Sequence, residues 1–367
     1  MPHPKLFTPI ALGGVTLPNR IVVSPMCQYS ADDGSMTDWH DFHVAQFAVS
    51  GAGLFMVEAT GVTREGRITH GCTGLYSEHN EAAMARRVAA YRRLTQNPIG
   101  VQIGHAGRKA STHAPWKGGK PLAGGESPWQ TVAPSPIPFG EGWHVPHELS
   151  TAEIRRLVDD FVSSAQRALR IGFDVLELHS AHGYLIHQFL SPVSNQRKDE
   201  YGKNRMKFAL EVAEAVRAAW PRERGLGARI NATDWVEGGF QPDDAVAYAK
   251  ELKRAGLDYV CVSSGASVAH ARIPVAPGYQ VPFAEKVKAS VPIAVRAVGM
   301  IADAEQAEKI VASGQADMVA MARAFLDNPR WVWHAADHFG VKLEGYPPQY
   351  ERSRPDLWPG ARVARPA

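Results

Sequence analysis

Eight short apolar runs, separated by helical patterns, limit the folds open to this chain more than any other feature of its sequence. Near-continuous apolar runs are typical of parallel strands that are covered on both faces. Eight βα units in one chain favour an α/β fold in which the strands close into a (β/α)8 TIM barrel over a doubly wound sheet. A dinucleotide-binding sheet would carry a glycine-rich turn after its first strand, where this chain reads SPMCQY. The eight predicted strands lie at residues 20–26, 53–60, 99–107, 174–182, 226–234, 258–265, 293–299 and 317–323.

The segments between these runs carry start and stop signals for helices. Ser150 and Glu153 have the spacing of a capping box ahead of a long helical pattern, and Gly172 follows that pattern. Three of the joints that lead from a helix into a strand read GFDVLEL, GLDYVCV and GQADMVAM, so glycine and aspartate recur there. This recurrence indicates one repeated supersecondary unit.

Two segments interrupt the alternation. Residues 106–150 are rich in proline, glycine and tryptophan and follow the third predicted strand, which is the place of an active-site lid. Residues 346–367 are rich in proline and arginine and show no periodicity. We therefore expect a single barrel domain over residues 1–345, with the insert as its lid, and a C-terminal arm over residues 346–367.

Composition narrows the class of protein further. With 367 residues, 45% hydrophobic and 21% charged, the chain suits one large globular domain. The net charge of +3 comes without a block of like charges, so we expect no nucleic-acid partner and no membrane partner. No signal peptide or bilayer-spanning run is recognisable. The three cysteines form no CxxC pair, and an odd number of them suits a cytoplasmic protein; they are Cys27, Cys72 and Cys261.

The carboxyl ends of the strands, where a TIM barrel has its active site, carry few acidic side chains. The acidic groups near them are Glu58, Glu177 and Asp234. A metal-dependent barrel hydrolase usually opens with a His-x-His pair, whereas the first strand here ends in methionine and cysteine, and HExxH is absent. This makes a metal site a poor second hypothesis. The other polar groups at these ends are Cys27, Gln102, His105, His179, His182, Tyr184, Arg229 and Arg323.

The histidine pair His179 and His182, followed by Tyr184, can hold a metal, bind an oxygen atom or fill space. Alone, the two imidazoles are two ligands short of a metal site. We therefore predict that their neutral N–H groups bind a carbonyl or nitro oxygen, with Tyr184 as a proton donor. For His187, inside the following helix, we predict a buried core position.

Glycine and arginine at the last two strands suit a phosphate group, which TIM barrels often bind in those loops. The residues in question are Gly299 and Arg323. With Arg229 in the middle of the site and Cys27 at its mouth, they suggest a phosphorylated, electron-accepting ring. Flavin mononucleotide (FMN) fits, because a cation near the N1–C2=O edge stabilises the reduced, anionic flavin.

Several motifs together resemble the old yellow enzyme family, and more narrowly its bacterial class that includes xenobiotic reductases and thermophilic-type ene-reductases. They are NRIVVSPMCQYS, GVQIGHAGRKA, LELHSAHGYLIHQFLSPVSNQRKDEYG, VSSGA, PGYQVPFAE, AVGMI and PQYER. The resemblance runs from Leu6 to Arg352. It implies a (β/α)8 barrel with non-covalent FMN that oxidises NADPH and reduces activated C=C bonds.

The resemblance also implies a role for each matching residue. Cys27 would lie at the N5/O4 edge of the flavin, Arg229 at N1/O2, and Gly299 with Arg323 at the phosphate. His179 and His182 would bind the substrate oxygen beneath Tyr184. Residues lining the flavin would also include Ser24, Pro25, Met26, Ala59 and Gln102, whereas Ser264, Gln280 and Tyr29 would lie at the cofactor or the substrate cavity.

The arm matches the family segment PQYER, whose arginine enters the active site of a neighbouring subunit. This implies a homodimer, or a tetramer built of dimers, in which Arg352 contacts substrate across the interface. The chain departs from the family at residues 201–208, which are three residues shorter, and at Ala322, where glycine is usual before the phosphate arginine. A non-enzymatic flavin redox sensor that uses the thiol of Cys27 remains an alternative, as does the metal-dependent hydrolase.

Overall fold

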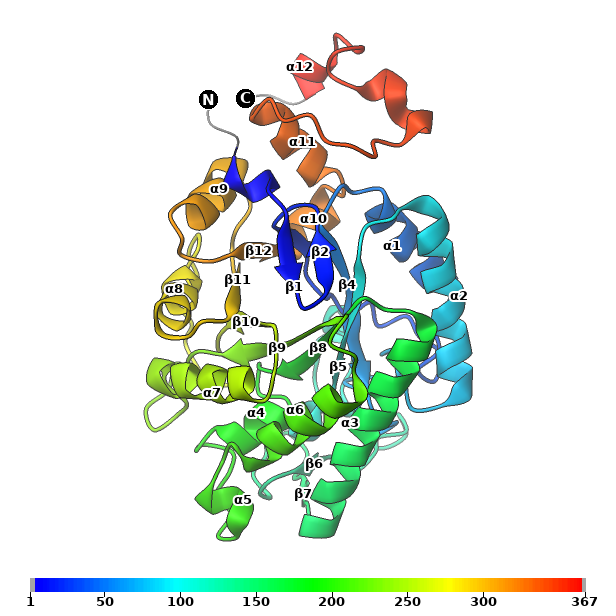
Figure 1. Cartoon of the computed structure of the whole chain (residues 1–367). Helices are drawn as coiled ribbons and strands as arrows, with labels where there is room; N and C mark the ends of the chain where they lie inside the picture. The colour runs from blue at the N-terminus through cyan, green and yellow to red at the C-terminus, as the bar shows by residue number, and fades with distance from the viewer. Residues whose placement is uncertain (1–3, 365–367) are drawn as a thin grey trace.

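A closed barrel of eight parallel strands lies at the centre of the computed structural model, which describes residues 4–364 (Figure 1). The strands follow one another around the barrel in chain order, and the last pairs with the first. All eight predicted strands are confirmed, although the first and the last end before Ser24 and Ala322. The barrel strands are β3 (Ile21–Val23), β4 (Leu54–Gly61), β5 (Ile99–Gly104), β8 (Val175–Ser180), β9 (Gly225–Asn231), β10 (Tyr259–Ser263), β11 (Ala294–Val298) and β12 (Met318–Met321).

Helices surround the barrel and pack their apolar sides on the outer face of the strands (Figure 1). The main ones are α1 (Asp38–Ala48), α2 (Glu78–Leu94), α3 (Thr151–Ile171), α6 (Lys207–Ala219), α7 (Pro242–Arg254), α8 (Val281–Ser290), α9 (Ala304–Ala312) and α11 (Trp331–His338). Shorter helices are α4 (Leu185–Leu190), α5 (Glu200–Lys203), α10 (Arg323–Asp327) and α12 (Ala361–Ala364), and 3-10 turns lie at η1 (Lys5–Phe7), η2 (Gly107–Lys109), η3 (Pro115–Lys117) and η4 (Pro348–Ser353). The predicted capping box of α3 is present between Ser150 and Glu153, and Gly172 ends that helix with a φ of 96°.

The recurring aspartate of the helix-to-strand joints fixes the register of neighbouring strands. The backbone N–H of Asp258 donates to the carbonyl of Leu226 at 2.7 Å, and the carboxylate of Asp258 accepts from the N–H of Leu226 at 2.8 Å. Asp174 with Ile99 and Asp317 with Val295 make the same pair of bonds. Each carboxylate also pairs with a cation of the helix that leads into the neighbouring strand; these are Arg217, Arg92 and Lys288, respectively. The repeated sequence is therefore a repeated register device at the amino-terminal end of the barrel.

A hairpin near the N-terminus, absent from the predicted elements, covers that same end. It consists of β1 (Ile10–Leu12) and β2 (Val15–Leu17), which pair antiparallel. Leu12 and Leu17 are buried in a small apolar cluster with side chains from inside the barrel, among them Met56 and Tyr259. The strand ends that carry the predicted site face the other way.

The insert at 106–150 contains only short elements, among them β6 (Val132–Ala133) and β7 (His147–Glu148). It packs over the carboxyl ends of the strands, because its residues Arg108 and Lys109 donate to carbonyls that follow β10, those of Ser267 and Ala266, at 2.7 and 2.9 Å. The shortened segment at 201–208 lies in α5 and at the start of α6.

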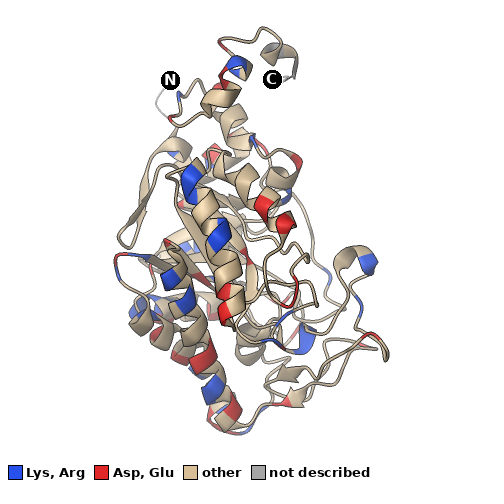
Figure 2. Cartoon of the chain, turned by 90° about the vertical axis from the view of Figure 1, so that its right-hand side faces the viewer, with Lys and Arg blue, Asp and Glu red and all other residues tan. Residues whose placement is uncertain are grey.

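The C-terminal arm projects beyond α11 at one end of the molecule (Figure 1). Tyr346 packs edge-on against Trp333 of α11 at 4.7 Å between ring centroids, and the guanidinium of Arg330 lies 4.3 Å from the ring of Tyr350. Arg352 is exposed. In the view of Figure 2, positions of lysine or arginine and positions of aspartate or glutamate are both spread over the outer helices. Among residues 4–364 no helix is long and apolar enough to cross a membrane.

Candidate active site

A hydrogen-bonded layer inside the barrel supports the predicted flavin residues Gln102 and Arg229. Glu177 on β8 is its centre: one carboxylate oxygen accepts from Nε2 of Gln102 at 2.7 Å, and the other accepts from the hydroxyl of Tyr259 at 3.0 Å and from Arg296. Nε of Arg229 lies 3.8 Å from this carboxylate. The layer is buried, and it directs the amide of Gln102 toward Glu177.

Arg229 offers a positive charge whose hydrogen bonds are incompletely used. Its side chain is 6% exposed, and NH2 donates to the hydroxyl of Ser24 at 2.7 Å. Within the described part of the chain, its Nε has no hydrogen-bond acceptor. A buried cation with a free donor suits an electron-rich group of a bound ring, as predicted for the N1/O2 edge of a flavin.

The segment Ser24, Pro25, Met26 and Cys27 follows β3 directly, as predicted, and leads to Tyr29, whose ring packs edge-on against Trp116 of the insert at 5.7 Å. Burial raises the pKa of the Cys27 thiol well above its usual value, and the neighbouring Cys72 and Glu58 raise this pKa further. Cys27 is therefore a neutral thiol. A redox-sensing cysteine is normally a low-pKa thiolate, so this environment disfavours the sensor hypothesis.

Gln280 connects two neighbouring strand ends that sequence analysis treated separately. Its Oε1 accepts from the hydroxyl of Ser264 at 2.6 Å, and its Nε2 donates to the carbonyl of Val298 at 2.8 Å. Gly299 has a φ of 116°, and a Cβ at this glycine would lie 2.3 Å from Nε2 of Gln280. Three predicted residues thus form one contact group, and only glycine fits at the third.

The predicted oxygen site is compact. The rings of His179 and His182 lie 5.2 Å apart between centroids, and the ring of Tyr184 lies 4.8 Å from that of His179. Burial lowers the pKa of both histidines well below its usual value, with smaller contributions that include the nearby charges of Arg229 and Lys109. Burial also raises the pKa of Tyr184. At neutral pH the pair is therefore uncharged and the phenol protonated.

A pocket with about 280 Å3 of empty space opens beside these rings. Ala59, His179 and Tyr184 line it, as the sequence predicted, together with Cys72 and His105. Burial lowers the pKa of His105 to about 4, so this side chain is neutral as well. Apart from Arg67, which also lines the pocket, the side chains of its wall are apolar or uncharged.

Two residues that contact the histidine pair were missed by sequence analysis. The hydroxyl of Ser263 lies 2.7 Å from Nε2 of His182. Lys109 is half-buried in the first turn of the insert, where its Nζ lies 5.0 Å from the ring centroid of Tyr184 and burial lowers its pKa to about 7. The only hint of Lys109 was its place in GHAGRKA, just after the third strand.

One prediction about the other site residues needs correction. Arg323 begins helix α10 after Ala322, and so does not end a strand. Arg352 lies in the arm and does not join the site of its own chain. His187 is fully buried, as predicted for a core histidine, and pairs with Asp234. Within residues 4–364, no three histidine, cysteine, aspartate or glutamate side chains come together as they would around a metal ion.

Several known proteins are similar in sequence to this chain over nearly its whole length. The model of the NADH:flavin oxidoreductase / NADH oxidase family matches residues 5–341. A NADPH dehydrogenase of Geobacillus thermodenitrificans is 44% identical over 352 residues, which cover 95% of this chain and 98% of that protein. The NADPH dehydrogenase of Bacillus subtilis is 40% identical over 353 residues, with the same coverage. Among solved structures, morphinone reductase is similar with a TM-score of 0.77 and 28% identity, over 94% of this chain and 92% of that chain.

Proposed function

The chain belongs to the NADH:flavin oxidoreductase / NADH oxidase family, which is the old yellow enzyme family, and from this we propose that it is an FMN-dependent ene-reductase. In the proposed reaction NADPH is oxidised and hydride reaches the β-carbon of an activated alkene, such as an enone or a nitroalkene. The observation that carries the proposal is the neutral, buried pair His179 and His182 beside the phenol of Tyr184.

The residues that would hold FMN fit that group. When bound, FMN supplies the redox chemistry by taking up hydride from NADPH and passing it on. Arg229 would place its charge at the pyrimidine edge, where reduction leaves negative charge, and Gly299 with Arg323 would bind the phosphate. The other proposed flavin contacts are Ser24, Pro25, Met26, Cys27, Ala59, Gln102 and Ser264.

The histidine pair would bind the oxygen of the substrate. The backbone N–H of Ala181 donates to Nδ1 of His179 at 3.4 Å, which leaves Nε2 of that ring as the N–H donor. The hydroxyl of Ser263 has Nε2 of His182 at 2.7 Å and Oε1 of Gln280 at 3.3 Å within reach. We propose that Ser263 donates to Nε2, so that His182 offers its Nδ1–H to the substrate. Two neutral donors stabilise an enolate-like oxygen without a proton transfer.

The proton for the α-carbon would come from Tyr184 or from water. The raised pKa of Tyr184 keeps its proton on the phenol until charge develops nearby. Tyr29 and Gln280 would border the substrate, and the insert 106–150 would act as the lid of the barrel domain 1–345. The bonds from Arg108 to Ser267 and from Lys109 to Ala266 support the lid, since they hold the insert over the strand ends.

We further propose a homodimer, or a tetramer of dimers, in which the arm 346–367 brings Arg352 into the active site of the partner. Support comes from the exposure of Arg352 and of Tyr350, Leu357 and Trp358 around it, because such a group of apolar side chains is usually covered in an assembly. The three cysteines are free thiols, which fits the proposed cytoplasmic location.

An absorption spectrum before and after anaerobic NADPH tests this function. We expect a yellow protein that releases FMN on denaturation and whose flavin absorbance NADPH bleaches, with recovery on adding 2-cyclohexenone. A flavin that NADPH leaves oxidised would instead favour a redox sensor, and a colourless protein that cannot be reconstituted with FMN would refute the proposal.

Variants of the histidine pair test the oxygen site. His179→Ala and His182→Ala should keep FMN and its reduction by NADPH. Each should lose affinity for phenols and reduce enones about 10²–10³-fold more slowly, the usual cost of one such donor. Turnover of cyclohexenone at the wild-type rate by either variant would contradict the assigned role.

A further inference from the structure

The turn that carries His182 is held in an unusual way at its backbone. The N–H of His182 donates to Oδ1 of Asn231 at 3.1 Å, and its carbonyl accepts from Nζ of Lys109 at 2.8 Å. Both partners are side chains from other parts of the barrel mouth. The two backbone polar groups of His182 are thus fixed from two directions.

The next residue is held in the same manner. The N–H of Gly183 donates to Nδ1 of His187 at 2.9 Å, and its carbonyl accepts from Nε2 of Gln188 at 2.7 Å. We call Asn231, Lys109, His187 and Gln188 the turn cradle. All four backbone polar groups of these two turn residues are therefore bound by cradle side chains.

The turn needs support because its conformation is unfavourable for an ordinary residue. His182 has a φ of 59° and Gly183 a φ of 68°, both in the left-handed region that favours glycine. A Cβ at Gly183 would lie 2.4 Å from the carbonyl of Ala266, so the turn also approaches its neighbour closely. Without the cradle, His182 would gain by leaving this conformation, and its ring would move with it.

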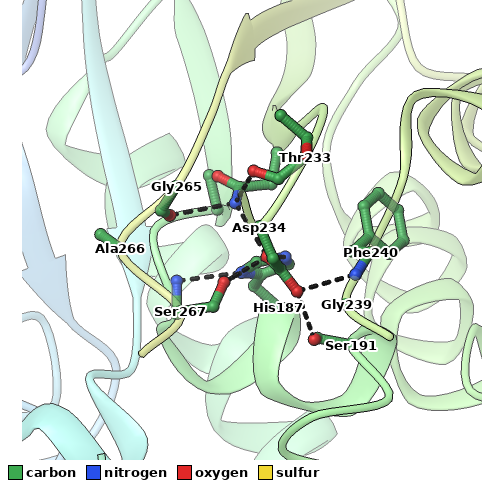
Figure 3. Close-up of polar contacts among 12 residues, drawn as sticks. His187, Ser191, Thr233, Asp234, Gly239, Phe240, Gly265, Ala266 and Ser267 are labelled. Atoms are coloured by element: carbon green, nitrogen blue, oxygen red, sulfur yellow. Dashed lines mark hydrogen bonds and ion pairs between the residues drawn. The ribbon is translucent and has the colours of Figure 1, made fainter. Parts of the chain in front are cut away.

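Asp234 contacts two residues of the turn cradle, Asn231 and His187, on the side away from the turn; its contact with His187 is drawn in Figure 3. Its carboxylate accepts from Nδ2 of Asn231 at 3.3 Å and lies 3.3 Å from Nε2 of His187. The same carboxylate accepts from the hydroxyls of Ser191 and Ser267 and from the backbone N–H of Phe240, as Figure 3 shows. Asp234 and His187 are both fully buried. Every group that faces this carboxylate is a donor.

This arrangement determines which nitrogen of His187 carries the proton. Nδ1 accepts from Gly183 and so carries no hydrogen, which places the ring proton on Nε2, toward Asp234. A carboxylate can only accept, and therefore favours that tautomer. An amide at position 234 would instead turn its NH2 group toward one of the donors and remove this preference.

We propose that the turn cradle positions His182 for binding the substrate oxygen, and that Asp234 anchors the cradle by fixing Asn231 and the Nε2–H tautomer of His187. The proposal rests on the proposed function, because it gives these residues a role through His182. None of them touches the substrate in this scheme, so they are positioning residues.

The test separates positioning from stability with matched variants of the FMN-loaded enzyme. His187→Leu removes the acceptor for Gly183, whereas His187→Asn keeps an acceptor near the position of Nδ1. Asp234→Asn removes the carboxylate at constant size. Asp258→Asn is the control, since Asp258 is a carboxylate that bonds backbone N–H groups at the opposite end of the barrel.

Two measurements report on His182 directly. The first is the affinity for 4-hydroxybenzaldehyde, followed through the flavin spectrum. The second is the rate at which the dithionite-reduced enzyme is reoxidised by 2-cyclohexenone, compared with reoxidation by oxygen, which needs no oxygen-binding site for a substrate. A loss of overall structure would affect both oxidants, whereas a displaced His182 slows only the enone.

We expect His187→Leu and Asp234→Asn to bind the phenol at least tenfold more weakly and to lose a similar factor with the enone, with the oxygen reaction unchanged. His187→Asn should recover most of the loss, and Asp258→Asn should lower thermal stability without changing phenol affinity. If Asp234→Asn fails to fold, the comparison of His187→Leu with His187→Asn decides. Wild-type phenol affinity in His187→Leu overturns the inference, whereas wild-type affinity in His182→Ala overturns the proposed function itself.

Discussion

The buried ion pair at the centre of the barrel gives a prediction whose size can be worked out from its contacts. Glu177 on β8 and Arg296 on β11 are both fully buried, and the guanidinium donates to the carboxylate. Tyr259 and Gln102 donate to the same carboxylate. The substitution Glu177→Gln keeps the size of the side chain and removes its charge.

The cost of this substitution comes mainly from the charge that is left behind. Burial lowers the pKa of Arg296 to about 9, so the guanidinium remains protonated at pH 7. Breaking a buried pair by removing one partner costs about 3–5 kcal/mol, because the other charge stays in a medium of low polarity. This is a large share of the total stability of about 5–15 kcal/mol that proteins have. We expect the free energy of unfolding to fall by about 4 kcal/mol.

Urea denaturation followed by circular dichroism measures this loss. The double variant Glu177→Gln with Arg296→Met removes the guanidinium that the single variant leaves without its partner, so that Arg229, whose Nε lies 3.8 Å from the carboxylate of Glu177, is the cation that remains beside position 177. Replacing both partners of a buried pair is often close to neutral. The double variant should therefore recover at least half of the loss. A cost below about 1 kcal/mol for Glu177→Gln, or a double variant that is no more stable than the single one, would show that the pair does not act as described.

Two further predictions concern acid and the arm. Burial lowers the pKa of four histidines, which are His43, His105, His179 and His182. Below pH 6.5 these side chains bind fewer protons in the folded than in the unfolded state, so the free energy of unfolding should fall as the pH drops through that value, by roughly 1 kcal/mol per histidine over the first pH unit. A thermal melting temperature that is constant from pH 6.5 to 5.5 would contradict this prediction. Truncation after Pro347 should lower the activity and change the flavin spectrum, whereas truncation after Leu357 should do neither. A fully active monomer in a sedimentation experiment, or unchanged kinetics of the Arg352→Ala variant, would refute the active site shared between subunits.

The fold could be predicted from the sequence because the same physical requirement recurs eight times. Each strand is covered on both faces and is therefore largely apolar, and three joints repeat an aspartate that bonds the neighbouring strand. The hairpin β1–β2 was missed because each of its strands has three residues, too few to show alternation. Local patterns thus identify elements that repeat or are long, and fail for short ones that depend on packing against the barrel end.

The site was predictable where its residues sit directly at strand ends. His179, for example, is the fifth residue of β8, and its place at the carboxyl end of the strand follows from that position. Lys109 and Ser263 were missed because their importance comes from partners distant in sequence: the amine reaches the carbonyl of His182 from 73 residues away, and the hydroxyl reaches its ring from 81. Nothing in the local sequence shows that the two backbone groups of one turn will be held by side chains.

Burial favours the neutral form of four titratable groups around the proposed oxygen site. It lowers the pKa of His179 and His182 and raises the pKa of Cys27 and Tyr184, so all four are neutral near pH 7. An enone is neutral, and only its product-like state carries negative charge on oxygen. In the proposed reaction a charged imidazole would bind anions from solution before the substrate arrives, whereas neutral donors interact most strongly once the oxygen becomes negative. Because catalysis requires stronger interactions in the transition state than in the ground state, the neutrality of this wall is what suits it to hydride transfer.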